Sequence, residues 1–269
     1  MLGNASPRQT WGMSELTGAA DGASAPNGAR RDPDGQSGVV ELADGRLLAS
    51  RRWPGTGVPL VALHGLFDCS LGWKKVAAAT TRPCVAFDLP GFGRSGMPAE
   101  NRFASYAQDI RCGLDILGVG NFSLVGHSLG GPVAAELSEQ ASDRTLNLTL
   151  LAPGGFGPVP LAELLGGSAL GRLARLGVPL AMANPLSAAG IYMAVVSHGH
   201  LPERQLLGRV IRRAFSTASG AFAANEATVA AGPGSGRVRA PSRALRRARV
   251  GAVGHERRLD SRLARGPRV

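Results

Sequence analysis

The sequence predicts an α/β protein with a mainly parallel sheet, helices on both faces, a helical cap insertion and the last strands missing. Between residues 58 and 153, apolar runs alternate with helical patterns. The connections between them are short, which is typical of a parallel sheet covered by helices. The alternation then stops, and residues 154–225 consist of apolar helical segments interrupted by glycine. These three observations together predict the fold class.

The individual elements follow from local pattern. Asp44-Gly45 between two alternating runs is a hairpin signal, and the continuous apolar run 58–65 is typical of a strand buried on both faces. Tyr106, Ile110 and Leu114 recur every fourth residue, which indicates an amphipathic helix that Gly118 or Gly120 would end. In order, we expect a hairpin (39–53), a strand (58–65), a helix (72–81), a strand with a glycine-rich loop (83–95), a helix (103–118), a strand (121–128), a helix (128–143) and a strand (145–153).

Composition supports a globular body with an unusual tail. The 269 residues are 44% hydrophobic, enough for a sizeable core, and the net charge is +11. Residues 232–269 hold eleven arginines against Glu256 and Asp260, so the rest of the chain is close to neutral. Basic charge confined to a tail argues against a dedicated nucleic-acid-binding domain. We therefore expect no specific nucleic-acid partner.

The domain organisation follows the same changes in pattern. The first residues are rich in Gly, Ala, Ser, Asp and Pro and lack any period, as in disordered segments. Beyond about residue 235 we find no buried-strand pattern. We divide the chain into a disordered N-terminal segment (1–37), an α/β core (38–153), a helical cap or lid (154–225) and an atypical Arg-rich tail (226–269).

The segment Gly126-His127-Ser128-Leu129-Gly130 matches the pattern G-x-S-x-G, between a predicted strand and a predicted helix. A serine hydroxyl is a weak nucleophile unless it is exposed and a base takes its proton. A sharp strand-to-helix turn would lift Ser128 clear of the sheet, and the flanking glycines leave room for that turn. We predict that Ser128 is a nucleophile, with His127 pointing away from it.

The same turn would create a site for negative charge. Ser128 would lie at a helix N-terminus, where unpaired N–H groups face a developing oxyanion. The N–H of Leu129 is the first predicted donor. The loop after the strand 58–65 should supply the second, which we assign to the N–H of Leu66.

Three segments, HGLF (64–67), DLPGFGRSG (88–96) and VGHSLGG (125–131), resemble the α/β-hydrolase superfamily in order and spacing. The resemblance extends over about residues 39–231. Within the superfamily, this sequence resembles the branch that has a serine nucleophile and a cap. The resemblance implies a helical cap over Ser128. It also implies hydrolysis of an apolar ester, thioester or diketone through an acyl-enzyme, with no cofactor and no metal.

The resemblance also implies a carboxylate and a histidine near the end of the chain, and these are hard to find. Gly254-His255 is similar to the family's histidine segment, so we take His255 as the predicted base. No Asp or Glu lies between 232 and 255, and the stretch after Leu151 also lacks one. The triad acid is therefore unknown. Glu226 is in the wrong context, His64 belongs to the oxyanion loop, and His198 and His200 belong to the predicted cap.

The tail has two interpretations. Its Arg, Ala, Gly and Pro content is what a frameshifted reading of a GC-rich gene tends to give, whereas a genuine basic tail would bind an anionic partner. Under the first interpretation, the protein is a catalytically impaired hydrolase-fold protein, degraded or acting as a binding module. This is the alternative to an active hydrolase.

Compartment and partners are less constrained. The three cysteines lack paired spacing, which favours a reducing compartment, and no basic-then-apolar signal pattern opens the chain. We expect a cytoplasmic protein. Pro179, Pro185 and Gly190 interrupt the uncharged stretch 176–197, so we expect no membrane span. The partner is a small apolar substrate, and the oligomeric state stays open.

Overall fold

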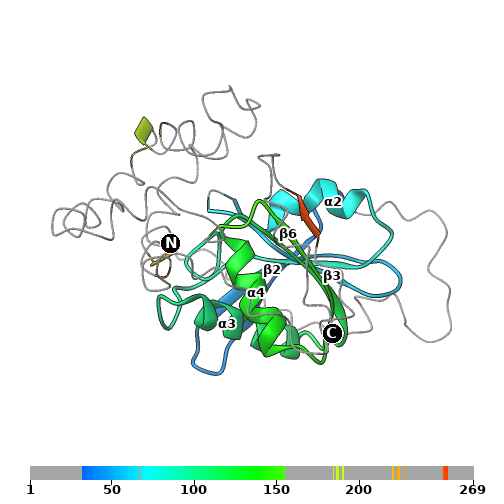
Figure 1. Ribbon diagram of the computed structural model, residues 1–269, viewed down its shortest axis with the longest axis horizontal. Coiled ribbons are helices and arrows are strands. Elements are labelled where there is room, and N and C mark those ends of the chain that lie inside the picture. Colours follow the sequence, from blue (N-terminus) through cyan, green and yellow to red (C-terminus); the bar gives the residue numbers. More distant parts are fainter. Residues whose placement is uncertain are drawn as a thin grey trace, which may run out of the picture.

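A twisted sheet runs through the centre of the protein (Figure 1). The computed structural model describes residues 32–66 and 68–154, isolated positions between 184 and 227, and the backbone of 251–253. In these parts the strand order is β1-β2-β4-β3-β5-β6-β7. The strands are β1 (Gln36–Glu41), β2 (Leu47–Trp53), β3 (Leu60–Leu63), β4 (Cys84–Phe87), β5 (Phe122–His127), β6 (Thr145–Leu151) and β7 (Gly251–Val253). The helices are η1 (Ser70–Trp73), α2 (Lys74–Ala78), α3 (Phe103–Ile116) and α4 (Gly130–Gln140).

The sheet is mainly parallel, as predicted. β4, β3, β5, β6 and β7 pair in parallel, whereas the β1–β2 hairpin joins β4 in antiparallel register. Parallel strands present their carboxyl ends at one edge, where ligands bind in open α/β sheets. The turns after β3, β4, β5 and β6 therefore define the region to search for a site.

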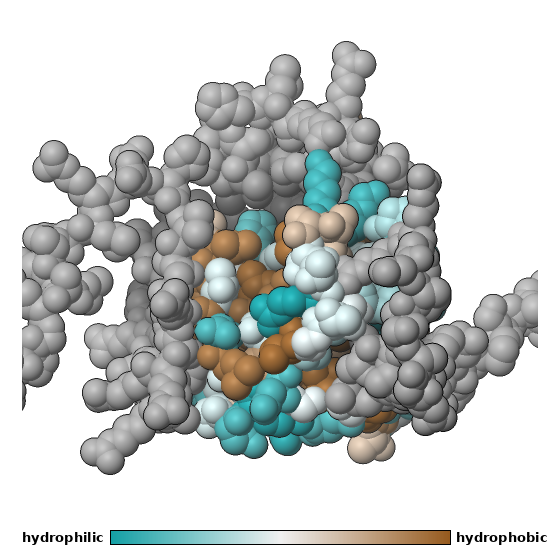
Figure 2. Space-filling view, turned by 90° about the vertical axis from the view of Figure 1, so that its right-hand side faces the viewer, coloured by the Kyte–Doolittle hydropathy of each residue, from teal (hydrophilic) through white to brown (hydrophobic). Residues whose placement is uncertain are grey.

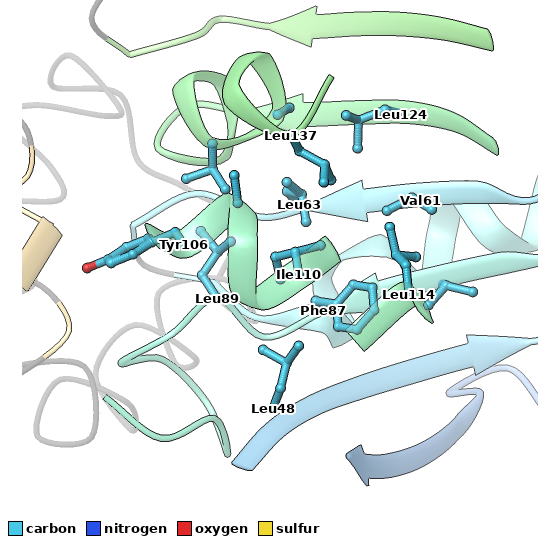
Figure 3. Packing of buried hydrophobic residues seen from close by; sticks show 14 of the residues in the cluster. Leu48, Val61, Leu63, Phe87, Leu89, Tyr106, Ile110, Leu114, Leu124 and Leu137 are labelled. Atoms are coloured by element: carbon cyan, nitrogen blue, oxygen red, sulfur yellow. The ribbon is translucent and has the colours of Figure 1, made fainter. Parts of the chain in front are cut away.

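Helices cover both faces of the sheet, which confirms the fold class. On β3, Val61 and Leu63 join one apolar cluster and Ala62 joins another, because successive strand residues face opposite ways. α3 and α4 pack on the first cluster, where Leu63, Ile110 and Leu137 lie together (Figure 3). η1 and α2 contribute to the second cluster. Burial on two faces explains why β3 reads as a continuous apolar run.

Most predicted elements between 39 and 151 are confirmed with shorter ends. The hairpin turns at Gly45, which has φ +81, and α3 is followed by Gly118 at φ +65. β1 begins at Gln36, inside the segment expected to be disordered, because its pairing with Arg52 continues the hairpin ladder. Such pairing uses main-chain groups and needs no apolar side chain.

The tail contains a strand that the sequence did not predict. Gly251–Val253 forms β7 and pairs in parallel with Thr149–Leu151 of β6. The expectation of no strand beyond residue 235 is wrong at this point. An exposed strand edge offers unpaired N–H and C=O groups, so a short segment can join it without an alternating apolar pattern.

The predicted cap falls almost entirely outside the described residues. At its end, however, Gly220, Ala223 and Ala224 are helical and buried. A Cβ on Gly220 would lie 2.6 Å from the carbonyl carbon of Gly91 and 3.2 Å from the Phe92 ring. The chain at Gly220 therefore packs closely on the loop after β4.

The described surface is mixed in character. Figure 2 shows apolar residues gathered around hydrophilic ones on the face turned toward the viewer. Within the part of the chain that the structure describes, no helix is long and apolar enough to cross a membrane.

Candidate active site

Ser128 occupies a strained turn between β5 and α4. Its φ is +49°, in the left-handed region that non-glycine residues rarely adopt. Its N–H donates to the carbonyl of Leu151 at 3.0 Å, and its carbonyl accepts from the N–H groups of Gly131 and Gly154, each at 2.9 Å. Neighbouring backbone thus holds Ser128 on both sides. This is the geometry that the G-x-S-x-G pattern predicts.

The glycines around Ser128 are required by close packing. A Cβ on Gly126 would lie 2.7 Å from the Cβ of Ala134, which brings β5 against α4. A Cβ on Gly130 would lie 2.5 Å from the carbonyl oxygen of Leu63, at the end of β3. Contacts this short do not occur for real side chains. The turn is therefore built from residues that permit the strand and helix to touch.

The loop after β3 passes directly beside the serine. A Cβ on Gly65 would lie 3.1 Å from the Cβ of Ser128. The carbonyl of Gly65 accepts from Nδ1 of His64 at 2.7 Å and from the N–H of Asp68 at 3.2 Å. Because a trans peptide points its C=O and N–H in opposite directions, the N–H of Leu66 is turned away from His64.

Leu129 begins the helix that follows the serine. It is the N-cap residue of α4, with φ −55° and ψ −36°, and it is buried. Among the described residues, no hydrogen bond is found for the N–H of Leu66 or of Leu129. Their role as oxyanion donors remains a prediction.

His64 and Asp88 brace the site. His64 is buried, and its Nε2 accepts from the N–H of Leu89 at 3.0 Å, so Nδ1 carries the proton given to Gly65. Asp88 accepts from the N–H of Ser70 at 2.7 Å and from that of Arg94 at 3.0 Å. Both side chains form hydrogen bonds with main-chain groups of the loops, which supports a structural role for His64 and for Asp88.

Replacing Asp88 with alanine should lower the free energy of unfolding by about 2 kcal/mol, because two main-chain N–H groups lose a buried acceptor. Urea denaturation measures this change. Arg94→Ala is the matched control, since it leaves the Arg94 N–H in place and removes only an exposed bond to Ser37. Equal losses in the two variants would contradict the bracing role of Asp88.

His127 lies close to the loop after β3, which the sequence did not suggest. His127 ends β5 and is exposed at the rim, yet its Nδ1 would lie 3.0 Å from a Cβ on Gly65. Burial lowers the pKa of His127, and the charge of Asp68 acts in the opposite direction. The Asp68 carboxylate itself lies over Gly72 of η1.

The other predicted triad residues are not brought together in the described structure. His255, Glu226, His198 and His200 lie outside the described residues. β6 ends at Leu151, and Ala152-Pro153-Gly154 then follows with φ +42° at Ala152 and no carboxylate. The register aligns His127 with Leu151 and Leu151 with Val253. In this part of the chain the acid therefore stays unassigned.

The described residues contain neither a candidate metal site nor a disulfide bond. No group of three or more His, Cys, Asp or Glu side chains there could hold a metal ion. Cys69 and Cys84 are buried free thiols, and Cys112 is a half-buried one.

Comparison with known proteins agrees with this geometry. Residues 58–176 match the model of the alpha/beta hydrolase fold family. Over 109 residues the chain is 41% identical to the Homo sapiens 1-acylglycerol-3-phosphate O-acyltransferase ABHD5, covering 36% of this chain and 30% of that protein. Over 176 residues it is 32% identical to an uncharacterized protein of Mycobacterium tuberculosis, covering 62% and 46%. The chain thus spans less than half the length of these curated relatives.

Solved structures give the same fold with varied activities. Bottromycin epimerase BotH has a TM-score of 0.61 at 20% identity, covering 84% of this chain and 83% of that one. A membrane phospholipase A described as a bacterial virulence factor has 0.56 at 24%, covering 74% and 63%. Epoxide hydrolase CorEH has 0.55 at 22%, covering 72% and 75%. At these identities the likeness concerns the fold alone, and the family match and the strand order show that residues 58–176 of the chain are similar to the alpha/beta hydrolase fold family.

Proposed function

We propose that the protein is a serine hydrolase that acts on a small apolar ester, thioester or diketone through an acyl-enzyme. The observation that carries this proposal is the position of Ser128, strained at φ +49° and placed beside Gly65. Strain in a turn of this kind persists only where surrounding structure enforces it, and it is concentrated at functional sites.

The proposed chemistry uses the groups around that serine. The Ser128 oxygen attacks the carbonyl carbon, and the resulting oxyanion accepts hydrogen bonds from the N–H groups of Leu66 and Leu129. Each donor of this type contributes about 3 kcal/mol to transition-state stabilisation. Water then hydrolyses the acyl-enzyme. The relatives named as an acyltransferase and a phospholipase support acyl chemistry at such a site.

The direct test is covalent labelling with a fluorophosphonate, which reacts with activated serines. Intact-mass and peptide analysis should place the label on Ser128, and Ser128→Ala should abolish both labelling and hydrolysis of p-nitrophenyl butyrate. Ser105→Ala on α3 is the matched control and should keep both. Activity that survives Ser128→Ala would remove the nucleophile assignment.

A second candidate is a hydrolase-fold protein without activity, either degraded or acting as a binding module. It is favoured by the missing carboxylate after β6, where Ala152-Pro153-Gly154 stands, and by the Arg-rich composition of the tail. This candidate predicts folded protein that binds an apolar ester analogue but takes no label. Sequencing the coding DNA tests the frameshift interpretation, because alternative frames after codon 231 should then encode a strand, an Asp and a Gly-His segment.

A further inference from the structure

Two neighbouring strands, β5 and β6, end in the same unusual backbone conformation. Their last paired residues are His127 and Leu151. The residues that follow them, Ser128 and Ala152, have φ +49° and +42°. In the part of the chain that the structure describes, no other non-glycine residue has a positive φ. Because this conformation is unfavourable for a residue with a Cβ, surrounding contacts must enforce it at both positions.

Two hydrogen bonds from the end of β6 hold the backbone of Ser128. The N–H of Ser128 donates to the carbonyl of Leu151 at 3.0 Å, and the carbonyl of Ser128 accepts from the N–H of Gly154 at 2.9 Å. The first bond holds the peptide group before the serine, and the second holds the peptide group after it. Since each peptide group is planar, its orientation on either side of Ser128 sets the φ and ψ of that residue.

The positive φ of Ala152 allows one short segment to reach both peptide groups. Leu151 and Gly154 are three positions apart, which is about 10 Å in an extended chain. Both nevertheless bond to the same residue, so the chain turns between them, at Ala152. The Ala152 side chain is exposed and gains no buried contact of its own. The strain at Ala152 is therefore offset by the bonds that the segment makes with Ser128.

The same segment packs on the first turn of α4. A Cβ on Gly131 would lie 2.6 Å from the Cβ of Pro153 and 2.9 Å from its Cα. The N–H of Gly131 donates to the Ser128 carbonyl at 2.9 Å, beside the bond from Gly154. Packing and hydrogen bonding thus fix the segment against the turn that holds the serine.

We propose that residues Ala152-Pro153-Gly154, here called the β6 turn, are the positioning element of Ser128, and that the left-handed conformation of Ala152 sets the orientation of the serine. The inference rests on the proposed function. A nucleophile must face the carbonyl carbon that it attacks, and a displacement of about 1 Å can slow such a step about 100-fold. The β6 turn acts through Ser128 and needs no contact with the substrate.

The β6 turn also orients the first predicted oxyanion donor. The Ser128 carbonyl and the Leu129 N–H belong to one peptide group, and in a trans peptide they point in opposite directions. The bond from Gly154 to that carbonyl therefore fixes the direction of the Leu129 N–H as well. A change in the β6 turn should disturb the hydroxyl and this N–H together.

The first test compares Ala152→Val with Ala152→Asn in the full-length protein. The two side chains are similar in size and replace an exposed methyl group, but a β-branched residue strongly disfavours positive φ, whereas asparagine adopts it readily. Ala152→Val should lower the limiting rate of fluorophosphonate labelling of Ser128 about 10-fold and leave the half-saturating concentration within about 2-fold. Ala152→Asn should keep both values within about 2-fold of the parent protein.

The second test removes the donor of the β6 turn. Gly154→Pro eliminates the N–H that bonds to Ser128 and should slow labelling about 10-fold. Gly154→Ala is the matched control, because it keeps the N–H and its Cβ would meet the nearest atom, the Ser128 carbonyl oxygen, at an ordinary 3.5 Å. We expect this control to label within about 2-fold of the parent protein.

A third variant separates orientation from stability. Asp109→Asn breaks the pair with Arg46 on α3, so it should lower the melting temperature seen by circular dichroism without slowing the labelling of Ser128. Equal slowing in Asp109→Asn and Ala152→Val would mean that reactivity follows stability, which overturns the positioning role.

The outcomes also distinguish this inference from the proposed function. Label on wild-type Ser128, together with equal limiting rates in Ala152→Val and Ala152→Asn, would overturn the role of the β6 turn and leave the nucleophile assignment intact. Absence of any label on wild-type Ser128 would overturn the proposed function and this inference with it.

Discussion

Replacing Gly130 with alanine should remove about 3 kcal/mol or more from the free energy of unfolding. The new Cβ would lie 2.5 Å from the carbonyl oxygen of Leu63, 2.7 Å from its carbonyl carbon and 2.8 Å from the carbonyl oxygen of His64. All three are backbone atoms at the end of a central strand. No side-chain rotation can relieve the collision, so α4 or β3 must move.

Urea denaturation followed by circular dichroism measures the loss. Gly120→Ala is the matched control, because a Cβ there meets nothing within 4 Å and the residue lies in the loop before β5. We expect the control to stay within about 0.5 kcal/mol of the parent protein. A Gly130→Ala protein as stable as the control would mean that helix and strand are not in contact at this point.

The turn that holds Ser128 could be predicted because its sequence pattern and its geometry have the same cause. Gly126 and Gly130 are fixed by the close approach of β5, α4 and β3, and Ser128 is fixed by the turn between them. Local pattern also located the hairpin at Gly45 and gave Gly118 as one of two glycines that could end α3, since both Gly45 and Gly118 have a positive φ. Where the cause of a turn lies in its own residues, the local sequence pattern reveals it.

Pairings between distant segments could not be predicted in the same way. Arg46 and Asp109 are 63 positions apart, and their pairing depends on how the hairpin packs against α3. Asp109 did carry a partial signal, because it is a charge on the buried face of α3, directly before Ile110. A buried carboxylate requires a partner, but its identity depends on the packing of the hairpin.

β7 is an element that the local sequence pattern could not predict. Gly251–Val253 is three residues long and pairs in parallel with the edge of β6. Period and propensity carry almost no information over so short a segment. The strand arises from an available edge rather than from its own sequence, which is why the tail read as strand-free.

Asp109→Asn should lower the free energy of unfolding by about 3 kcal/mol, because it leaves the Arg46 charge without its main partner. The two guanidinium nitrogens of Arg46 contact the two carboxylate oxygens of Asp109 at 2.5 and 2.7 Å, and the carboxylate is only 6% exposed. This bond is the chief reason that the pKa of Arg46 is raised, so Arg46 keeps its charge at any accessible pH. The pair joins the hairpin turn to α3.

The matched control is Asp44→Asn, which removes the other carboxylate that contacts Arg46. Asp44 is 50% exposed, so water replaces it readily and the unfolding curve should hardly move. The double variant Arg46→Met/Asp109→Leu should recover most of the loss, because an apolar pair leaves no buried charge behind. If Asp109→Asn and Asp44→Asn prove equally mild, the pair does not join hairpin and helix; if only the double variant regains stability, the cost lies in the orphaned Arg46 charge rather than in the lost contact.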